Sequence, residues 1–151
     1  MVITYYVEID HDIPYSRQEF SDWIRVIVSN SKSWGAGKVF KETMNKRTAQ
    51  ILVRMTSPAT IQRECNMSDL SCSILSDNVI LINWERWKNG SKESGLSTEF
   101  YRVYIILHEF GHLLGYNHVP IGTCNPDGTA NVMTQQTRGI GTCRPNPWSF
   151  S

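Results

Sequence analysis

The string His108-Glu109-Phe110-Gly111-His112 joins residue types that bind metal ions with one that moves protons. On a helix, two histidines four residues apart lie one turn apart on the same face, a spacing at which both imidazoles can bind one zinc ion. Glu109 lies between them, and its carboxylate can act as general base toward a water that the zinc binds. Zinc itself lowers the pKa of that water to about 7 and polarises the carbonyl to be attacked. The string therefore predicts hydrolysis at a zinc centre.

A third histidine completes the predicted ligand set. Catalytic zinc takes three protein ligands and leaves a fourth position open, and His118 follows His112 by six residues. A straight helix would carry His118 away from the first two histidines, so the chain must turn, and Gly115 permits a left-handed turn. The full spacing favours His108, His112 and His118 as ligands over a structural histidine pair on a solvated helix face.

Caps and apolar spacing predict the helices that position these residues. Behind Ser97 as N-cap, a core-facing stripe predicts one long helix to Gly115, with the histidines on the opposite face. Ser16 and Glu19 form a capping box for a helix that ends near Asn30. A short helix begins at Ser57-Pro58 and ends at about Glu64. The stripe of the long helix consists of Phe100, Val103, Tyr104, Leu107, Gly111 and Leu114.

Runs of β-branched and aromatic residues predict the strands, which are residues 2–9, 39–44, 50–56, 73–75 and 79–84. The second and third of these form either a β-hairpin or a crossover pair, and residues 33–37 and 85–97 are loops. Past Gly115, glycine, proline and asparagine interrupt every regular pattern. This order predicts an α+β fold in one domain, residues 1–151. Within it, residues 1–117 form an upper part with the active-site helix and residues 118–151 a small irregular C-terminal subdomain.

Four cysteines lie in loop-like surroundings rich in glycine, proline, asparagine and serine, which is typical of disulfides in oxidising compartments. Their spacings do not match a structural zinc site, so we prefer bridges Cys65–Cys72 and Cys124–Cys143 among the three possible pairings. Closing the second loop would stabilise the fold by roughly 3 kcal/mol. Four reduced thiols are the alternative.

Composition excludes several kinds of partner. The 15 Lys+Arg residues are scattered and balanced by 14 Asp+Glu, so no basic stripe favours nucleic acid or an anionic membrane. The longest apolar stretch, residues 103–107, is too short to cross a bilayer. The first ten residues are typical of a strand and not of a secretory signal, so the compartment stays unknown even though the cysteines favour an oxidising one.

With these motifs in place, the chain resembles the metzincin metalloproteases. Their zinc string is followed by a methionine turn beneath the metal, and Met133 fits that turn. The resemblance implies a twisted mixed sheet of about five strands with one antiparallel edge strand, a backing helix and the active-site helix. It also implies a peptide or protein substrate that adds as a strand to the edge, predicted at residues 73–75. Residues 134–140 would form a wall of the pocket that takes the substrate side chain following the scissile bond.

The resemblance extends over most of the chain to a bacterial family of uncharacterised, mostly secreted or membrane-tethered metzincin-like domains. It implies the cysteine pairing preferred above and an extracytoplasmic location for typical members, whose N-terminal export segment is not found here. The shared residues are Ser57-Pro58-Ala59-Thr60, Cys65, Ser71-Cys72, Asn83, Arg86-Trp87, Tyr101-Arg102, Val132-Met133, Gln135-Gln136-Thr137, Gly139, Cys143 and Pro145-Asn146-Pro147-Trp148.

The leading hypothesis is a zinc metallopeptidase with Glu109 as base. Two alternatives use the same residues: a noncatalytic zinc-containing module that binds peptides, and a zinc hydrolase of a non-peptide amide. Arg138 or Arg144 is a weak candidate for steadying the oxyanion. Two groups of residues have ordinary structural interpretations, namely His11 as part of a surface turn and Trp84, Trp87 and Trp148 as buried anchors. Tyr116 and Asn117 lie between the predicted ligands, where support of the ligands or packing and catalysis are both open.

Overall fold

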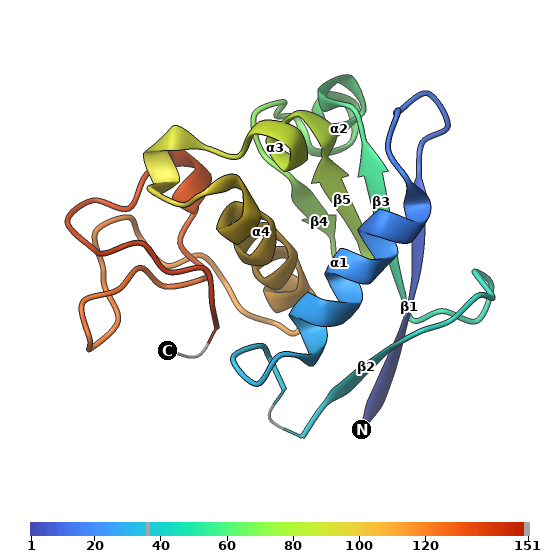
Figure 1. Cartoon of the computed structure of the whole chain (residues 1–151), viewed down its shortest axis with the longest axis horizontal. Coiled ribbons are helices and arrows are strands. Elements are labelled where there is room, and N and C mark those ends of the chain that lie inside the picture. Colours follow the sequence, from blue (N-terminus) through green and yellow to red (C-terminus); the bar gives the residue numbers. More distant parts are fainter. Residues whose placement is uncertain (36, 150–151) are drawn as a thin grey trace.

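The computed structural model describes residues 1–35 and 37–149 and has the predicted α+β class, with one mixed five-stranded sheet and four α-helices (Figure 1). Residue 36, in the predicted loop 33–37, and residues 150–151, at the end of the predicted C-terminal subdomain, lie outside the described residues. The elements are β1 (Val2–Ile9), α1 (Arg17–Ser29), β2 (Val39–Glu42), β3 (Ile51–Thr56), α2 (Pro58–Cys65), β4 (Cys72–Ile74), β5 (Val79–Asn83), α3 (Trp84–Asn89), η1 (Lys92–Ser94), α4 (Thr98–Leu113) and η2 (Gln136–Arg138).

The strand order in the sheet is β2-β1-β3-β5-β4. All neighbours are parallel except β4, which pairs antiparallel with β5 and forms one edge. The hairpin between the second and third strands, one of the two arrangements considered, is wrong because β2 and β3 lie on opposite sides of β1. Tyr5 of β1 pairs with Glu42 on one side and with Ile51 on the other. Strand β1 thus pairs with β2 through the first half of its eight residues and with β3 through the second half.

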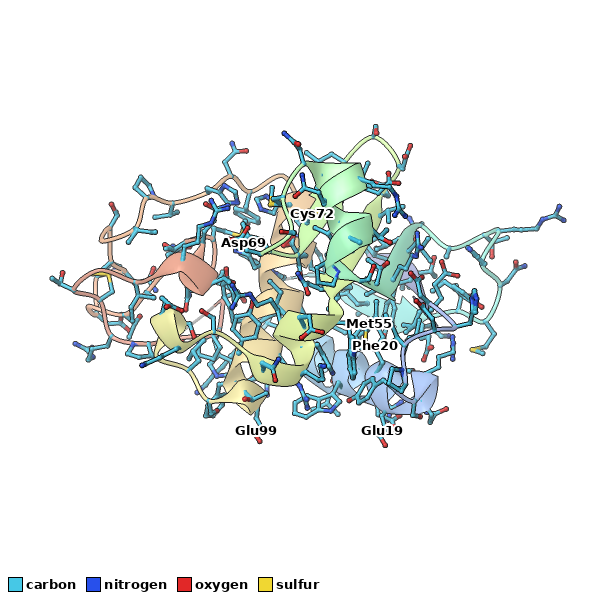
Figure 2. All side chains as sticks on the ribbon, turned by 90° about the horizontal axis from the view of Figure 1, so that it is seen from above. Glu19, Phe20, Met55, Asp69, Cys72 and Glu99 are labelled. Carbon is cyan, nitrogen blue, oxygen red and sulfur yellow. A yellow bond between two sulfur atoms is a disulfide. The ribbon has the colours of Figure 1, made fainter. Side chains whose placement is uncertain are left out.

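The core lies on the face of the sheet that α1 and α4 cover (Figure 1). Side chains alternate along a strand, so Val7, Val53 and Ile80 point to this face and are fully buried. Phe20 of α1 and Met55 of β3, both labelled in Figure 2, are fully buried members of this core. On the opposite face, α2 covers only the β4–β5 end, where Ile61, Cys72 and Leu81 form a second small cluster. The rest of that face has no helix over it and carries the charged residues Glu8, Lys41 and Arg54 together with Val2 and Val39, which are more than half exposed.

Serine caps confirm the three predicted helix starts. The hydroxyl oxygens of Ser16, Ser57 and Ser97 accept hydrogen bonds from backbone N–H groups in the first turns of α1, α2 and α4, at 3.2 Å in each case. The predicted loop 85–97 is wrong, because it contains α3 and η1. Asn83 starts α3 by accepting hydrogen bonds from the N–H groups of Glu85 and Arg86. Among the described residues, no helix is long and apolar enough to span a membrane.

Helix α4 is buried on nearly all sides and not along a single stripe. The sheet covers one side, and the irregular C-terminal segment covers another: the Tyr104 hydroxyl donates to the carbonyl of Thr134, and the hydroxyls of Tyr101 and Thr137 are 2.8 Å apart. Phe100, predicted for the core stripe, is half exposed because it lies in the first turn, before the helix is covered. The C-terminal segment therefore contributes to holding helix α4 in place.

Both preferred disulfides are confirmed, and they account for all the cysteines. Cys65 and Cys72 join the end of α2 to the edge strand β4, with an Sγ–Sγ distance of 2.05 Å. Cys124 and Cys143 join the two ends of the irregular segment, at 2.02 Å. The alternative of four reduced thiols does not hold in this structure.

Candidate metal centre

Three imidazoles converge where α4 ends. His108 and His112 lie one turn apart on α4, and the chain then turns at Gly115, whose φ of +99° is the left-handed conformation that the spacing predicts. This turn brings His118 back, so that one ring nitrogen from each histidine lies within 4.8 Å of the others. The Nε2 atoms of His112 and His118 are 3.1 Å apart. The three histidines could therefore hold a metal ion.

Hydrogen bonds to carbonyl groups set the tautomer of two of these rings. The Nδ1 atom of His108 is 2.7 Å from the carbonyl oxygen of Val132, and Nδ1 of His112 is 3.1 Å from that of Tyr116. A carbonyl oxygen only accepts, so each Nδ1 carries the proton and donates it. Each Nε2 then keeps its lone pair for a metal ion, and the carbonyl fixes the ring orientation.

Burial keeps all three rings neutral, which is the form that binds metals. It lowers the pKa of His108 to about 3, although the hydrogen bond to Val132 opposes the shift. Burial also lowers the pKa of His112 and of His118, and the charge of Arg138 lowers that of His118 further. At neutral pH no proton has to be displaced from these nitrogens before a metal ion binds.

Glu109 lies beside the histidines but deeper than a solvated helix face would place it, with only 2% of its surface exposed. Burial raises the pKa of its carboxyl to about 8, and a hydrogen bond from Ser73 opposes the shift. The Ser73 hydroxyl lies 2.9 Å from Oε1 of Glu109 and 3.1 Å from its backbone carbonyl oxygen. The sequence analysis missed Ser73, because only the position of β4 against α4 brings it to Glu109.

A cleft of about 210 Å³ opens in front of this group. One wall belongs to the residues that lead into β4, and the other to the segment after Met133, from which Gln135 and Thr137 line the cleft as predicted for residues 134–140. Arg138 and Asp69 bridge the two walls through two 3.2 Å contacts; Figure 2 labels Asp69 next to Cys72. The full lining is Met67, Leu70, Ser71, Cys72, Ser73, Leu75, Tyr104, Ile105, His108, Glu109, His112, His118, Gln135 and Thr137.

Met133 is buried and packs against the ligand helix at Gly111. A Cβ atom at Gly111 would lie 2.5 Å from Sδ of Met133 and 2.9 Å from Cζ2 of Trp34, so only glycine fits between these two side chains. Trp34 also donates to the carbonyl of Leu107 at 2.7 Å and stacks on Tyr116, with ring centroids 4.6 Å apart. Tyr116 thus supports His112, because its carbonyl oxygen accepts the hydrogen bond from Nδ1 of that ring.

The other candidate residues lie away from the three histidines or have structural partners. Arg138 is paired with Asp69, and Arg144 donates to the carbonyl of Asp127 in the irregular segment. Trp87 is fully buried, and Trp84 and Trp148 pack partly buried against the same core. His11 is exposed in the turn after β1.

Fold and site together define an α+β protein with a three-histidine cluster able to hold a metal ion beside a buried glutamate. The chain belongs to the family described as protein of unknown function (DUF3152), whose model matches residues 1–144. A comparison with curated proteins finds no match.

Proposed function

We propose that this protein is a zinc-dependent metallopeptidase of metzincin type that hydrolyses peptide bonds. The observation that carries the proposal is the convergence of three neutral imidazoles with a buried carboxylate in one cleft. The metzincin assignment rests on the resemblance of the zinc string and of Met133. The antiparallel edge strand and the mixed five-stranded sheet agree with it.

The donor set fits zinc. In a tetrahedral site with Zn–N distances of 2.0–2.1 Å, two ligand nitrogens lie about 3.3 Å apart, and the Nε2 atoms of His112 and His118 are 3.1 Å apart. Imidazoles whose second nitrogen donates to a carbonyl are typical zinc ligands. Three protein ligands would leave one position for a water or substrate, which is the pattern of catalytic zinc.

When bound, zinc would polarise the substrate carbonyl and acidify a water. The positive charge of the zinc would favour the ionised form of Glu109, against the burial that raises its pKa. In that form Glu109 accepts a proton from the attacking water and passes it to the nitrogen of the leaving amine. Its burial excludes bulk water, so the proton is not lost to solvent between the two transfers. The carbonyl oxygens of Val132 and Tyr116 keep the rings of His108 and His112 oriented throughout.

The cleft favours an extended peptide with an apolar side chain. Met67, Leu70, Leu75 and Ile105 give it apolar walls, and its polar groups gather at the histidines. Strand β4 pairs only with β5 among the described strands, so its outer edge has backbone groups free to pair with a peptide. This arrangement would place the scissile carbonyl near the imidazoles.

The proposal is tested by exposing a proteome-derived peptide library to zinc-loaded wild type and to Glu109→Ala, with zinc content measured for each. We expect cuts, identified by mass spectrometry, with wild type only, while both proteins hold about one zinc per chain. Loss of zinc from Glu109→Ala would instead mean that the glutamate is structural.

Absence of cuts by a zinc-loaded wild type would favour one of two alternatives, a noncatalytic zinc-containing peptide-binding module or a zinc hydrolase of a non-peptide amide. Binding of library peptides without cleavage identifies the first. Hydrolysis of small amide substrates without peptide cleavage identifies the second. A binding module has no need for the buried base, which is why we favour hydrolysis.

A further inference from the structure

Ser73 is a polar residue on the face of the sheet that otherwise packs against helices. Its neighbours in β4, Cys72 and Ile74, point to the opposite face and join the cluster under α2. Because side chains alternate along a strand, Ser73 must face α4. Its partner in β5 is Ile80, a fully buried core residue on that same face. A hydroxyl at this position therefore needs a partner on α4.

That partner is Glu109. The Ser73 hydroxyl has one proton, and two acceptors of the same residue lie within reach, Oε1 at 2.9 Å and the backbone oxygen at 3.1 Å. Within the described residues, the Glu109 carboxylate has no other hydrogen-bond donor. A buried carboxylate without a donor is costly and free to rotate. The single hydroxyl of Ser73 thus determines where the carboxylate points.

Two features hold Ser73 in place on its own strand. The disulfide Cys65–Cys72 ties the adjacent residue to α2, and the ladder with β5 fixes the register of Ser73 opposite Ile80. A strand of three residues at a sheet edge would otherwise be free to slip. The disulfide to α2 and the ladder with β5 therefore fix β4, and β4 directs the Ser73 hydroxyl toward α4.

We infer that Ser73 is a positioning residue, which holds the Glu109 carboxylate in the orientation for proton transfer in the cleft; this inference rests on the proposed function. Ser73 touches no reacting atom and acts through Glu109. Its loss would leave the imidazoles and their carbonyl partners intact, so metal binding and proton transfer can be separated experimentally.

The first test compares hydrolysis by wild type, Ser73→Ala and Ser73→Thr, each loaded with zinc. We expect Ser73→Ala to lower kcat about 10- to 100-fold with KM unchanged, since a hydrogen bond to a charged group is lost. Ser73→Thr keeps the hydroxyl and a good strand former, and should restore most of the rate. A kcat of Ser73→Ala within twofold of wild type, or an equal loss in both variants, would overturn the inference.

Ser21→Ala is the matched control, because the Ser21 hydroxyl also donates to a glutamate, Glu42, at 2.6 Å, but far from the cleft. It should lower the thermal midpoint without changing kcat. If Ser21→Ala lowers kcat as much as Ser73→Ala, the effect of Ser73 is only structural.

A second readout does not depend on turnover. Acetohydroxamate chelates zinc and carries N–H and O–H groups that can donate to a neighbouring carboxylate, so calorimetry of its binding reports whether Glu109 is in place. We expect weaker binding by Ser73→Ala and by Glu109→Ala than by wild type, at equal zinc content. Equal affinity for wild type and Ser73→Ala overturns the inference even if the wild type cleaves no peptide. Absence of peptide cleavage with the expected order of affinities overturns only the proposed function.

Discussion

The histidines come from two regions that are held together by different interactions. His108 and His112 belong to residues 1–117, where a sheet ladder and a large apolar core fix the helix that carries them. His118 begins residues 118–149, which have only one short 3₁₀ helix in the described part of the chain. The carbonyl of Val132 in this second region nevertheless orients His108 in the first.

In the second region, side-chain amides add to two isolated β-bridges, Cys124–Ala130 and Thr129–Arg144. Asn125 and Asn146 both donate to the carbonyl of Ala130. Asn131 accepts from the backbone N–H of Met133, and Gln136 donates to the carbonyl oxygens of Asn131 and Asn146. These bonds, together with Cys124–Cys143, satisfy backbone groups that helices and strands satisfy elsewhere.

An imidazole of the cluster can therefore be held by a backbone that is fixed but not regular, as His118 is. A ladder is cooperative and extends over the whole sheet, whereas each amide bond is local. The second region should therefore depend more strongly on its covalent link than the first does. The following changes test that difference.

Removal of the disulfide in the irregular region, by Cys124→Ser with Cys143→Ser, should have the largest effect. The bond closes a loop of 19 residues, so the free energy of unfolding should fall by about 3 kcal/mol. Zinc affinity should also fall, because His118 and the Val132 carbonyl lose their restraint. Urea unfolding and a competition titration with a chelator measure the two effects.

The same change in the sheet region, Cys65→Ser with Cys72→Ser, is the direct counterpart. This bond closes a loop of only 7 residues, so the loss in free energy of unfolding should be about 2 kcal/mol. Zinc affinity should stay at the wild-type value, since no ligand lies on this loop. An equal loss of zinc affinity in both double variants would show that the two regions are not held differently.

Gly111→Ala tests the contact between the regions. The added methyl group would meet Met133 and Trp34, and overpacking of this kind costs about 1–3 kcal/mol, less about 1 kcal/mol for the better helix former. We expect a net loss of up to about 2 kcal/mol in urea unfolding. Gly35→Ala, where no atom lies within 4 Å of the added methyl, is the control and should stay within about 0.5 kcal/mol of wild type.

The smallest expected change in the free energy of unfolding comes from removing an ion pair. Burial alone would raise the pKa of Asp10, but hydrogen bonds from Arg54 and Thr56 lower it below its ordinary value. Because the folded pKa is lowered, the stabilisation exists above the unfolded pKa of about 3.9 and is lost as the pH falls through the folded value. Asp10→Asn should therefore lower the free energy of unfolding by less than about 1 kcal/mol at pH 7.

That difference from wild type should shrink in urea unfolding at pH 3. Asp69→Asn removes the corresponding ion pair between the two regions, since the hydrogen bond from Arg138 lowers the pKa of Asp69 as well. A difference for Asp10→Asn that is equally large at pH 3 and pH 7 would contradict the pKa direction.

Local patterns in the sequence predicted the parts of the molecule that depend on near neighbours in the chain. The caps of α1, α2 and α4, the turn at Gly115 and the clustering of three histidines follow from spacing, because helix geometry fixes which residues share a face. The cysteine pairing also followed from local context. The α+β class followed from the order of the elements.

Contacts between residues distant in sequence were decided only by the tertiary structure. The positions of β2 and β3 on opposite sides of β1 depend on pairing across more than 30 residues, and a strand pattern specifies a face but not a neighbour. The burial of Glu109 and its bond to Ser73 require β4 to lie against α4. The contacts of the C-terminal segment with α4, such as the bond from the Tyr104 hydroxyl to the carbonyl of Thr134, join residues 30 apart in the chain. Burying a polar group costs free energy unless it is hydrogen-bonded, and the partners that satisfy these groups are ones that no sequence spacing brings near.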